Sequence, residues 1–432
     1  MDFRLTDEQL EFQQKCRKFA VEVIRPAAAR HDREQSVPWD VMKEARRWKL
    51  SGMDLLQQMA TDDGGLKGVI YAEELHYGCA GIALSISASG LAAAGIAASG
   101  TPEQIGKWVP ECYGIGDDLK LGAYAVTEAG AGSDVKSLRT TAKRDGDEWV
   151  LNGTKVFISN GGIADVTVVV ATVDPELGHR GQASFVVPKG TPGLSQGKKE
   201  DKLGIRASQT TEVVLEDCRI PLDNLLGGMD KLERKLERAR SGQSGGKSNA
   251  LATFEITRPL VGASALGIAQ AAYEWTLDYL EDKSEDGVPL LDQQRVQQVL
   301  AEVATEIDAS RLLVWRAAWM GRNGVPMTAG QGSMSKLKAG DMAMWATTAL
   351  MDLVGPFAQS TDCPLEKFFR DAKIYQIFEG TAQVQRLVVA RMQRQYYRQQ
   401  RGEGDQEVVQ QAPGTSQGDV IGQASEAVAA AS

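Results

Sequence analysis

The sequence predicts an α+β protein of several domains, with a helical domain first, a β domain second and a further helical domain third. Three observations carry this prediction. The first hundred-odd residues of the 432-residue chain are rich in Ala, Leu and Glu, with apolar residues at helical spacing. Near residue 118 the chain changes to β-branched runs separated by turn-forming residues. From Phe254 to about Gln399 helical spacing returns.

The first helix begins at a capping motif. Thr6 has Gln9 three positions later, which is a capping-box pair, and apolar residues follow at helical spacing until Pro26. Further on, the stretch from Cys79 to Thr101 contains no charged residue and is long enough to span a membrane. It consists mostly of Ala, Ser and Gly, which insert weakly into lipid. We therefore expect a pair of buried helices and no membrane contact.

Five β-branched segments predict the strands of the middle domain. They are separated by Gly, Asn, Asp and Pro, which form turns. The segments are LKLGAYAVTE, DEWVLNGTKVFIS, ADVTVVVATV, ASFVVPK and TTEVVLEDCRI. Together they predict a β domain of roughly a hundred residues.

Two further segments lack a core pattern. In KLERKLERARSGQSGGKS, the charged half is typical of a short solvated helix and the Gly/Ser-rich half of a linker. After Arg401 the composition turns to Gly, Gln, Ser and Ala without periodicity, as in a disordered tail. The predicted boundaries are 1–117 for the N-terminal helical domain, 118–228 for the β domain, 229–249 for the insertion, 250–401 for the C-terminal helices and 402–432 for the tail.

Composition and charge argue against several classes of function. Acidic residues number 57 against 48 basic ones, whereas a nucleic-acid-binding protein needs basic surface to neutralise phosphates. The 5 cysteines are far apart without a C-x-x-C pair and the 3 histidines are scattered, so we expect neither a disulfide framework nor a metal site. The N-terminal segment is acidic and amphipathic, unlike a signal or transit peptide, and we therefore expect a cytoplasmic location.

A first candidate site is AYAVTEAGAGSD, residues 123–134. Gly130 and Gly132 allow backbone amides to approach a flat ring or a phosphate closely, while Thr127 and Ser133 add hydroxyl groups that bond polar edges. The segment is not a G-x-G-x-x-G dinucleotide fingerprint, because Val135 follows GAGSD. Taken alone, it is equally consistent with a plain hairpin turn.

A second candidate is Glu379, within RDAKIYQIFEGTAQVQRLVVARM, residues 370–392. This carboxylate follows Ile377 and Phe378 and precedes Gly380 at the start of an amphipathic helix. Apolar surroundings would raise its pKa from about 4.3 towards neutrality, as a base that removes a carbon-bound proton near physiological pH requires. The alternative is a carboxylate that only favours the helix dipole.

Six segments occur in a characteristic order: EELHYGCAG (73–81), YAVTEAGAGSD (124–134), GTKVFISNGG (153–162), LGIRASQTTEVVLEDCRIP (203–221), FEITRPLVGASALGIAQ (254–270) and EKFFRDAKIYQIFEGTAQVQRLVVAR (366–391). Together they resemble the acyl-CoA dehydrogenase family over roughly residues 2–398, closest to its medium-chain type. The resemblance implies an N-terminal α-helical domain, a middle β-barrel-like domain and a C-terminal four-helix bundle, with FAD held between the last two. This agrees with the order of domains read independently from the residues.

The resemblance also implies a reaction, the α,β-dehydrogenation of an acyl-CoA thioester to trans-2-enoyl-CoA. Glu379 would take the α proton, and the flavin would accept the β-hydrogen as hydride. The Glu379 backbone N–H and a flavin ribityl hydroxyl would polarise the thioester carbonyl. By the family pattern, the residues for FAD are Tyr124, Val126, Thr127, Gly132, Ser133, Phe157, Ile158, Ser159, Lys283, Thr381 and Gln383, of which 157–159 replace the usual Trp-Ile-Thr. Those for acyl-CoA are Ser133, Glu255, Thr257, Arg258 and Gly380.

Two signatures of that family are altered. The usual Arg-x-Thr-Phe-Gly, whose Arg neutralises the flavin pyrophosphate, is KSEDG here, with Lys283 for the Arg and Asp286 for the aromatic residue. The usual Gln-x-x-Gly-Gly-x-Gly, which wraps the flavin of the neighbouring subunit, is DLVGPFA at 352–358. Both changes affect what one subunit gives its neighbour's cofactor. We therefore expect either a heterotetramer with a related subunit or a divergent homotetramer.

The sequence is also consistent with other functions. An acyl-CoA oxidase would share the fold and the base, although such chains are usually much longer, and a low-activity structural subunit of a heteromeric enzyme would keep the fold alone. The resemblance further implies an electron-transferring flavoprotein as the electron acceptor. Ala83 and Ser87 stand where relatives have larger polar residues at the floor of the acyl cavity, which predicts a deep or wide pocket.

Overall fold

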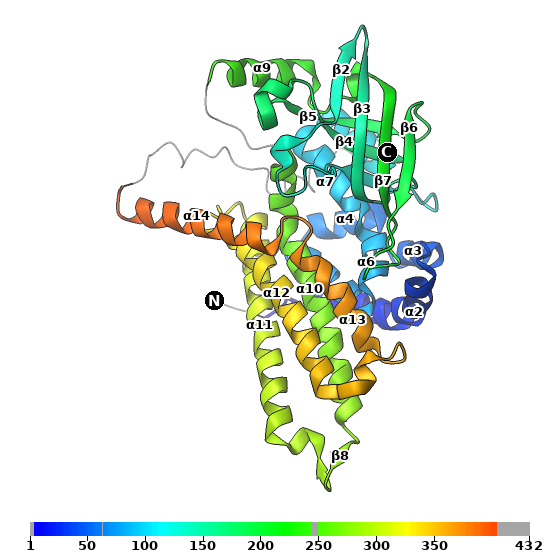
Figure 1. The fold of residues 1–432 in the computed structure, drawn as a ribbon, viewed down its shortest axis with the longest axis vertical. Helices are drawn as coiled ribbons and strands as arrows, with labels where there is room; N and C mark the ends of the chain where they lie inside the picture. The colour runs from blue at the N-terminus through cyan, green and yellow to red at the C-terminus, as the bar shows by residue number, and fades with distance from the viewer. Residues whose placement is uncertain (1–3, 63, 243–248, 404–432) are drawn as a thin grey trace.

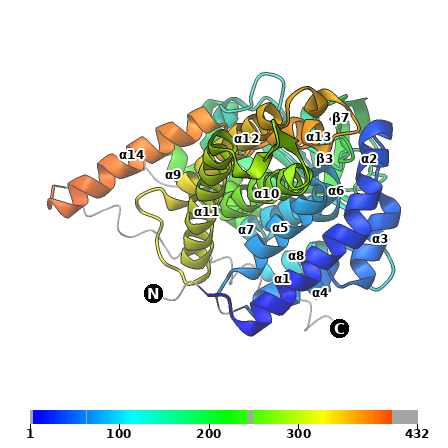
Figure 2. The same cartoon turned by 90° about the horizontal axis from the view of Figure 1, so that it is seen from below.

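The computed structural model describes residues 4–62, 64–242 and 249–403, with the backbone alone for 249–256. Figure 1 shows the curled sheet above a bundle of long helices, and Figure 2, seen from below, shows the N-terminal helices alongside that bundle. The predicted order of helical, β and helical domains is thereby confirmed. The predicted tail and the Gly/Ser-rich half of the predicted insertion lie almost entirely outside the described residues.

The N-terminal domain starts at the predicted cap. Thr6 Oγ1 accepts a hydrogen bond from the Gln9 N–H (3.2 Å), and Gln9 Oε1 accepts one from the Thr6 N–H (3.1 Å). Pro26 does not end the helical run, because a π-helical turn shifts the register and Pro26 falls in the first turn of the next helix, where proline is tolerated. The elements are α1 (Asp7–Phe19), the π-turn η1 (Ala20–Ile24), α2 (Arg25–Glu34), α3 (Trp39–Arg47), α4 (Gly52–Ala60), α5 (Lys67–Gly78), α6 (Ala80–Ser87), α7 (Ser89–Ser99) and α8 (Pro102–Glu111).

The uncharged stretch forms the predicted pair of buried helices, α6 and α7. Among the described residues, Ala80–Ser99 is the one stretch long and apolar enough to cross a membrane, and 67% of it is buried against the rest of the protein. Its small residues allow close packing. At Gly95 a Cβ would lie 2.5 Å from the ring of Tyr124 in the sheet. The stretch therefore contributes to the contact between the first two domains.

The middle domain is a seven-stranded sheet curled around its own core, which confirms the barrel-like prediction. One part joins β2, β3, β7 and β6 by antiparallel pairing, the other joins β1, β4 and β5, and the pair Thr141–Thr172 links them. Across the core, Trp149 meets Phe185 at 5.2 Å between ring centroids. The elements are β1 (Gly122–Ala125), η2 (Val135–Ser137), β2 (Thr141–Asp145), β3 (Glu148–Ser159), β4 (Val166–Thr172), η3 (Pro175–Gly181), β5 (Gln182–Pro188), β6 (Leu194–Lys199), β7 (Thr210–Pro221) and η4 (Leu222–Asn224). The sequence reading missed β2 and β6.

The charged half of the predicted insertion forms a helix, α9 (Gly228–Arg240). One side of it packs on the β domain: Leu232 is buried, and Lys235 Nζ donates to the backbone oxygen of Gln182 at 2.6 Å. The helix that the charge pattern predicted is present. It is solvated on one side only.

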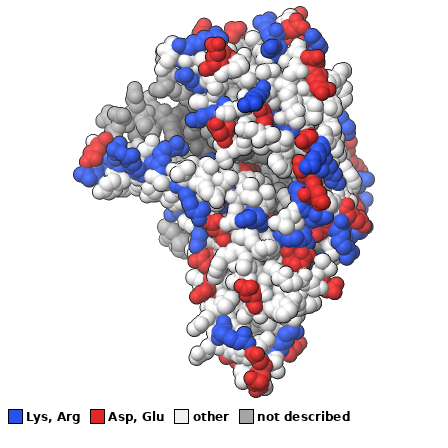
Figure 3. Space-filling model, in the orientation of Figure 1, with Lys and Arg blue, Asp and Glu red and all other residues white. Residues whose placement is uncertain are grey.

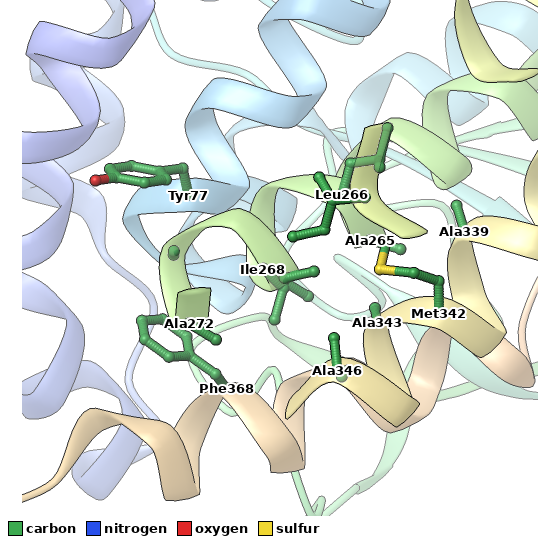
Figure 4. Packing of buried hydrophobic residues seen from close by; sticks show 14 of the residues in the cluster. Tyr77, Ala265, Leu266, Ile268, Ala272, Ala339, Met342, Ala343, Ala346 and Phe368 are labelled. Carbon is green, nitrogen blue, oxygen red and sulfur yellow. The ribbon is translucent and has the colours of Figure 1, made fainter. Parts of the chain in front are cut away.

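The C-terminal domain is a bundle of long helices that approach each other through small residues. In Figure 4, Ala272 of α10 and Ala343 and Ala346 of α12 belong to one buried cluster. Gly340 of α12 lies so close to the backbone of Tyr375 that a Cβ would be 2.6 Å from its carbonyl oxygen. The elements are α10 (Asn249–Leu280), β8 (Ser284–Glu285), β9 (Val288–Pro289), η5 (Leu290–Asp292), α11 (Gln294–Arg322), α12 (Gln331–Val354), η6 (Gly355–Gln359), α13 (Pro364–Ala372), η7 (Lys373–Gln376) and α14 (Ala382–Gln400).

Charged groups of both signs are interspersed on the face shown in Figure 3. Ion pairs within the β domain include those of Arg219 with Asp145 and Glu148. This face therefore carries no broad field of one sign that would attract a polyanion.

Candidate active site

Glu379 lies in the tight turn that connects η7 to α14. Its φ is +51° and that of Gly380 is +95°, so two successive residues adopt left-handed backbone. Only glycine fits the second position, because a Cβ there would lie 2.3 Å from Gln385 Nε2. The helix begins three residues later than Glu379, with Thr381 as its N-cap, whose hydroxyl accepts from the Val384 N–H at 3.2 Å. The strained turn presents the base just ahead of the helix.

The carboxyl group of Glu379 is enclosed by residues of α10 and α12. Burial of this group raises the pKa of Glu379 above its usual value, although the residue as a whole is only partly buried. A hydrogen bond from Thr257 Oγ1 to Glu379 Oε2, 2.5 Å long, acts in the opposite direction. The positive charges of Lys336 and Arg258 also lower the pKa. The carboxyl group is thus desolvated, together with groups that keep its ionised form accessible. Ile377, one of the two apolar residues expected to desolvate it, is 49% exposed.

The backbone carbonyl groups of the same turn accept hydrogen bonds from buried side chains. Gln385 Nε2 donates to the carbonyl oxygens of Glu379 (3.2 Å) and Gly380 (3.3 Å), and Lys336 Nζ donates to that of Gly380 (2.8 Å). Among the described residues, the Glu379 N–H makes no hydrogen bond. This N–H is therefore available to a ligand.

The residues predicted to contact acyl-CoA are only partly gathered here. Thr257 and Arg258 are buried on α10, the first against the carboxylate of Glu379 and the second near Ser333, whose hydroxyl lies 3.3 Å from its Nη1. The side chain of Glu255 lies outside the described residues. Ser133 is exposed in the loop after β1.

That loop forms the second part of the site. Built Cβ atoms at Gly130 and Gly132 would meet nothing within 4 Å, so the loop leaves open space beside its backbone. Thr127 O accepts from the Val156 N–H at 2.8 Å, which joins the loop to β3. Segments 123–134 and 153–159 therefore lie side by side, as the family pattern requires.

Phe157 presents an exposed aromatic face beside this loop. Its backbone has φ of +57°, at an irregularity in the pairing of β3 with β7, and its side chain is 63% exposed. An aromatic residue held outwards on strained backbone, beside an open glycine loop, fits the isoalloxazine of FAD. Ile158 is buried and Ser159 half-buried.

Two of the residues predicted to line the flavin have buried side chains. The side chains of Tyr124 and Val126 are buried in the cluster between the sheet and α7. Any contact that they make with a cofactor therefore comes from the backbone. Gln383 is exposed in the first turn of α14, and Thr381 is half-buried.

Sequence reasoning missed a buried ion pair beneath the loop. Lys155, which is 0% exposed, donates from Nζ to Glu128 Oε1 (2.8 Å) and to the backbone oxygen of Val126 (2.9 Å). Glu128 also accepts from the Thr140 hydroxyl (2.6 Å) and the Arg139 N–H (2.7 Å). Burial opposes ionisation of Glu128, but these partners hold its pKa below the usual value. The ion pair could have been suspected from the sequence, because Lys155 interrupts the otherwise uncharged segment GTKVFIS.

Lys283 is not part of this site. It lies next to the hairpin β8–β9 at the far tip of the bundle, whereas Glu379 precedes α14 at the end near the sheet (Figure 1). Lys283 Nζ lies 3.9 Å from the ring centroid of Tyr279, and Tyr279 stacks on Phe357 at 5.5 Å. The two altered signatures, 283–287 and 352–358, therefore form one patch, as expected if both serve a neighbouring subunit.

Comparisons with known proteins agree with this geometry. Family models of the acyl-CoA dehydrogenase N-terminal, middle and C-terminal domains match residues 6–114, 123–218 and 244–393. The mitochondrial short-chain specific acyl-CoA dehydrogenase of Rattus norvegicus is 38% identical over 384 residues, covering 87% of this chain and 88% of that protein.

Two solved structures have the same fold over nearly their whole length. Butyryl-CoA dehydrogenase from Megasphaera elsdenii matches with a TM-score of 0.80 and 34% identity, covering 90% of this chain and 99% of the other. A chain solved in work on the electron transferring flavoprotein of Acidaminococcus fermentans matches with a TM-score of 0.80 and 33% identity, over the same shares of the two chains.

Fold and family models together define a flavin-dependent oxidoreductase. The chain belongs to the acyl-CoA dehydrogenase family, and its activity is the FAD-dependent dehydrogenation of acyl-CoA thioesters. The two enzymes compared are named for short acyl chains, whereas the sequence motifs had indicated the medium-chain type.

Proposed function

We propose that Glu379 is the base that removes the α proton of the acyl-CoA thioester. The observation that carries this proposal is the desolvated carboxyl group, whose pKa is raised, in hydrogen-bond contact with Thr257 at 2.5 Å. A carboxylate whose pKa is raised is a stronger base when ionised.

The backbone of Glu379 serves the same step. Removal of the α proton places negative charge on the thioester oxygen, and a preorganised N–H directed at that oxygen stabilises this charge. The Glu379 N–H has no acceptor among the described residues, while the adjoining carbonyl oxygens are already engaged by Gln385 and Lys336. We assign this N–H to the thioester oxygen.

The surface around Phe157, Thr127 and Ser133 would hold FAD. Exposed apolar area on Phe157 and open backbone at Gly132 suit a flat ring, and the hydroxyl groups suit its polar edge. Bound FAD supplies the acceptor for the β-hydrogen, a two-electron chemistry that no side chain offers.

Substitution of the base tests the proposal. We expect Glu379→Gln to lower kcat by about 10²–10⁴-fold, because the amide cannot accept the proton. Turnover of butyryl-CoA with an artificial electron acceptor measures this, and the flavin spectrum reports whether the thioester still binds. Glu302→Gln, on the exposed side of α11, is the matched control. Near-normal turnover by Glu379→Gln would transfer the role of base to another residue.

We propose a short-chain acyl-CoA as the substrate and an electron-transferring flavoprotein as the acceptor. The support is the names of relatives that align over most of the chain. Anaerobic bleaching of the flavin by butyryl-, octanoyl- and palmitoyl-CoA should be fastest with the first. Fastest bleaching by palmitoyl-CoA would instead favour the deep pocket that Ala83 and Ser87 predicted.

The quaternary structure that we propose is an oligomer in which the patch of Lys283, Tyr279 and Phe357 faces a neighbouring subunit. The support is that both altered signatures lie in this patch, far from the chain's own base. The neighbour is either a second copy or a related subunit that completes the flavin site.

A further inference from the structure

Lys336 is buried in the bundle next to the turn that carries Glu379. Its side chain is 1% exposed, and its Nζ donates to the carbonyl oxygen of Gly380 at 2.8 Å. An ammonium group removed from water is costly unless negative charge or strong acceptors compensate it. The position of Lys336 therefore needs an electrostatic explanation.

Other buried lysines have a carboxylate in direct contact. Lys155 Nζ lies 2.8 Å from Glu128 Oε1, and Lys367 is paired with Asp371. Within the described part of the chain, Lys336 has no carboxylate at that distance, and its hydrogen bond goes to a backbone carbonyl. The nearby charge that it can balance is that of Glu379, with a further contribution from Asp341.

The same face of α12 holds the segment that leads to the base. Gly340 lets the helix approach the Tyr375 carbonyl, since any Cβ there would lie 2.6 Å from that oxygen. One position on, Asp341 accepts from Gln376 Nε2 at 2.7 Å. Lys336 lies one helical turn earlier and reaches Gly380. α12 therefore contacts the chain on both sides of Glu379.

We propose that Lys336 is a positioning residue for the dehydrogenation: it fixes the turn of Glu379 through the Gly380 carbonyl and stabilises the ionised base. This inference rests on the proposed function, in which Glu379 is the base. It adds a residue from a different helix whose charge, as well as its hydrogen bond, serves the reaction.

The protonation behaviour of the groups supports the proposal. Burial lowers the pKa of Lys336 to about 8, and the charges of Glu379 and Asp341 act against this shift, so the group is mostly cationic at pH 7. Conversely, the charge of Lys336 lowers the pKa of Glu379. The other ionisable groups that face this pair are Arg258 from α10 and Tyr375 from η7.

Lys336→Met tests the charge while keeping the length of the side chain. Loss of the cation should raise the pKa of Glu379, so the acidic limb of kcat/KM for butyryl-CoA should move up by roughly 1 pH unit. At a fixed pH below the pKa of the base, turnover should fall about tenfold. The reason is that the ionised fraction of the base falls about tenfold for each unit by which its pKa rises. Lys338→Met is the matched control, since Lys338 is partly exposed on the same helix and pairs with Glu306.

An unchanged pH profile in folded, flavin-loaded Lys336→Met would overturn the proposal, even if its melting temperature fell. If this variant does not fold, Lys336→Met is made in the Glu379→Gln background. In that background the carboxylate that needs the lysine is absent, and we expect folding to be recovered. Failure to fold in both backgrounds would show that Lys336 has only a structural role and would contradict the proposal. The turnover of Glu379→Gln alone, with Lys336 intact, tests the base separately.

Discussion

Thr257 shows how one hydroxyl group adjusts the base. A hydrogen bond donated to a carboxylate stabilises its ionised form and lowers its pKa, which opposes the effect of burial on Glu379. We expect Thr257→Val, which keeps the shape and removes the donor, to raise the pKa of Glu379. Because the base acts when ionised, the acidic limb of the pH–rate profile should move to higher pH by roughly 1 unit, as expected for a hydrogen bond to a charged group.

The control for this prediction is Thr257→Ser, which retains the hydroxyl group and should keep the profile near that of the unsubstituted enzyme. The valine variant could instead keep its acidic limb and lose only affinity for the thioester. That result would show that Thr257 contacts acyl-CoA, as the family resemblance implies, and does not adjust the pKa of Glu379. Measuring kcat and KM separately across pH distinguishes the two roles.

At the scale of one element, β3 supports the loop after β1 through a fully buried residue. Lys155 binds both the Val126 carbonyl and the carboxylate of Glu128. Lys155→Met would leave that carboxylate buried without its cation, which should cost about 3–5 kcal/mol of unfolding free energy. The displaced loop should also retain FAD less well. Chemical denaturation and the ratio of flavin to protein absorbance measure the two effects.

Lys143→Met, on the exposed side of β2, is a suitable control for this loss. Adding Glu128→Gln to Lys155→Met should recover part of the stability, because no unpaired buried charge then remains. Full flavin content in Lys155→Met would mean that the ion pair supports the sheet alone.

The strands also show what a sequence pattern can and cannot predict. β4 was predictable because all seven of its residues are buried and most are β-branched. β2 (TAKRD) and β6 (LSQGKK) were missed, since their mainly polar residues face solvent and only pairing with β3 and β7 makes them strands. The composition of a segment does not show which strand it pairs with.

For the whole molecule, the order of domains could be predicted because it depends on neighbouring residues: the periodicity of apolar residues changes along the chain. Glu379 was singled out for its apolar neighbours, but Ile377 is 49% exposed and the groups around the carboxylate come from α10 and α12. The supports of the site could not be predicted, because they come from distant segments: Lys336 reaches Gly380 across 44 positions, and Lys155 reaches Glu128 across 27. Only tertiary packing brings these charges to the ligand-binding surfaces.

The tip of the bundle carries the residues on which the proposed oligomer depends. The turn between β8 and β9 has Asp286 in place of the expected aromatic residue, followed by Gly287, which the family pattern retains; both have positive φ. Asp282 adds negative charge near Lys283, which lies over the ring of Tyr279, whereas Glu285 is paired with Arg295. An anionic tip repels a pyrophosphate, so a homo-oligomer in which this tip meets the neighbour's FAD should hold the cofactor weakly.

We therefore expect the chain purified alone to carry less than one FAD per chain, and a related partner subunit to restore full occupancy. Light scattering after size-exclusion chromatography gives the oligomeric state, and the flavin absorbance gives the occupancy. Asp286→Asn removes one negative charge at the tip and should raise occupancy, whereas Asp230→Asn, exposed on α9, should not. A homotetramer with one FAD per chain would show instead that the substituted tip binds the cofactor unaided, through the exposed aromatic surface of Phe357.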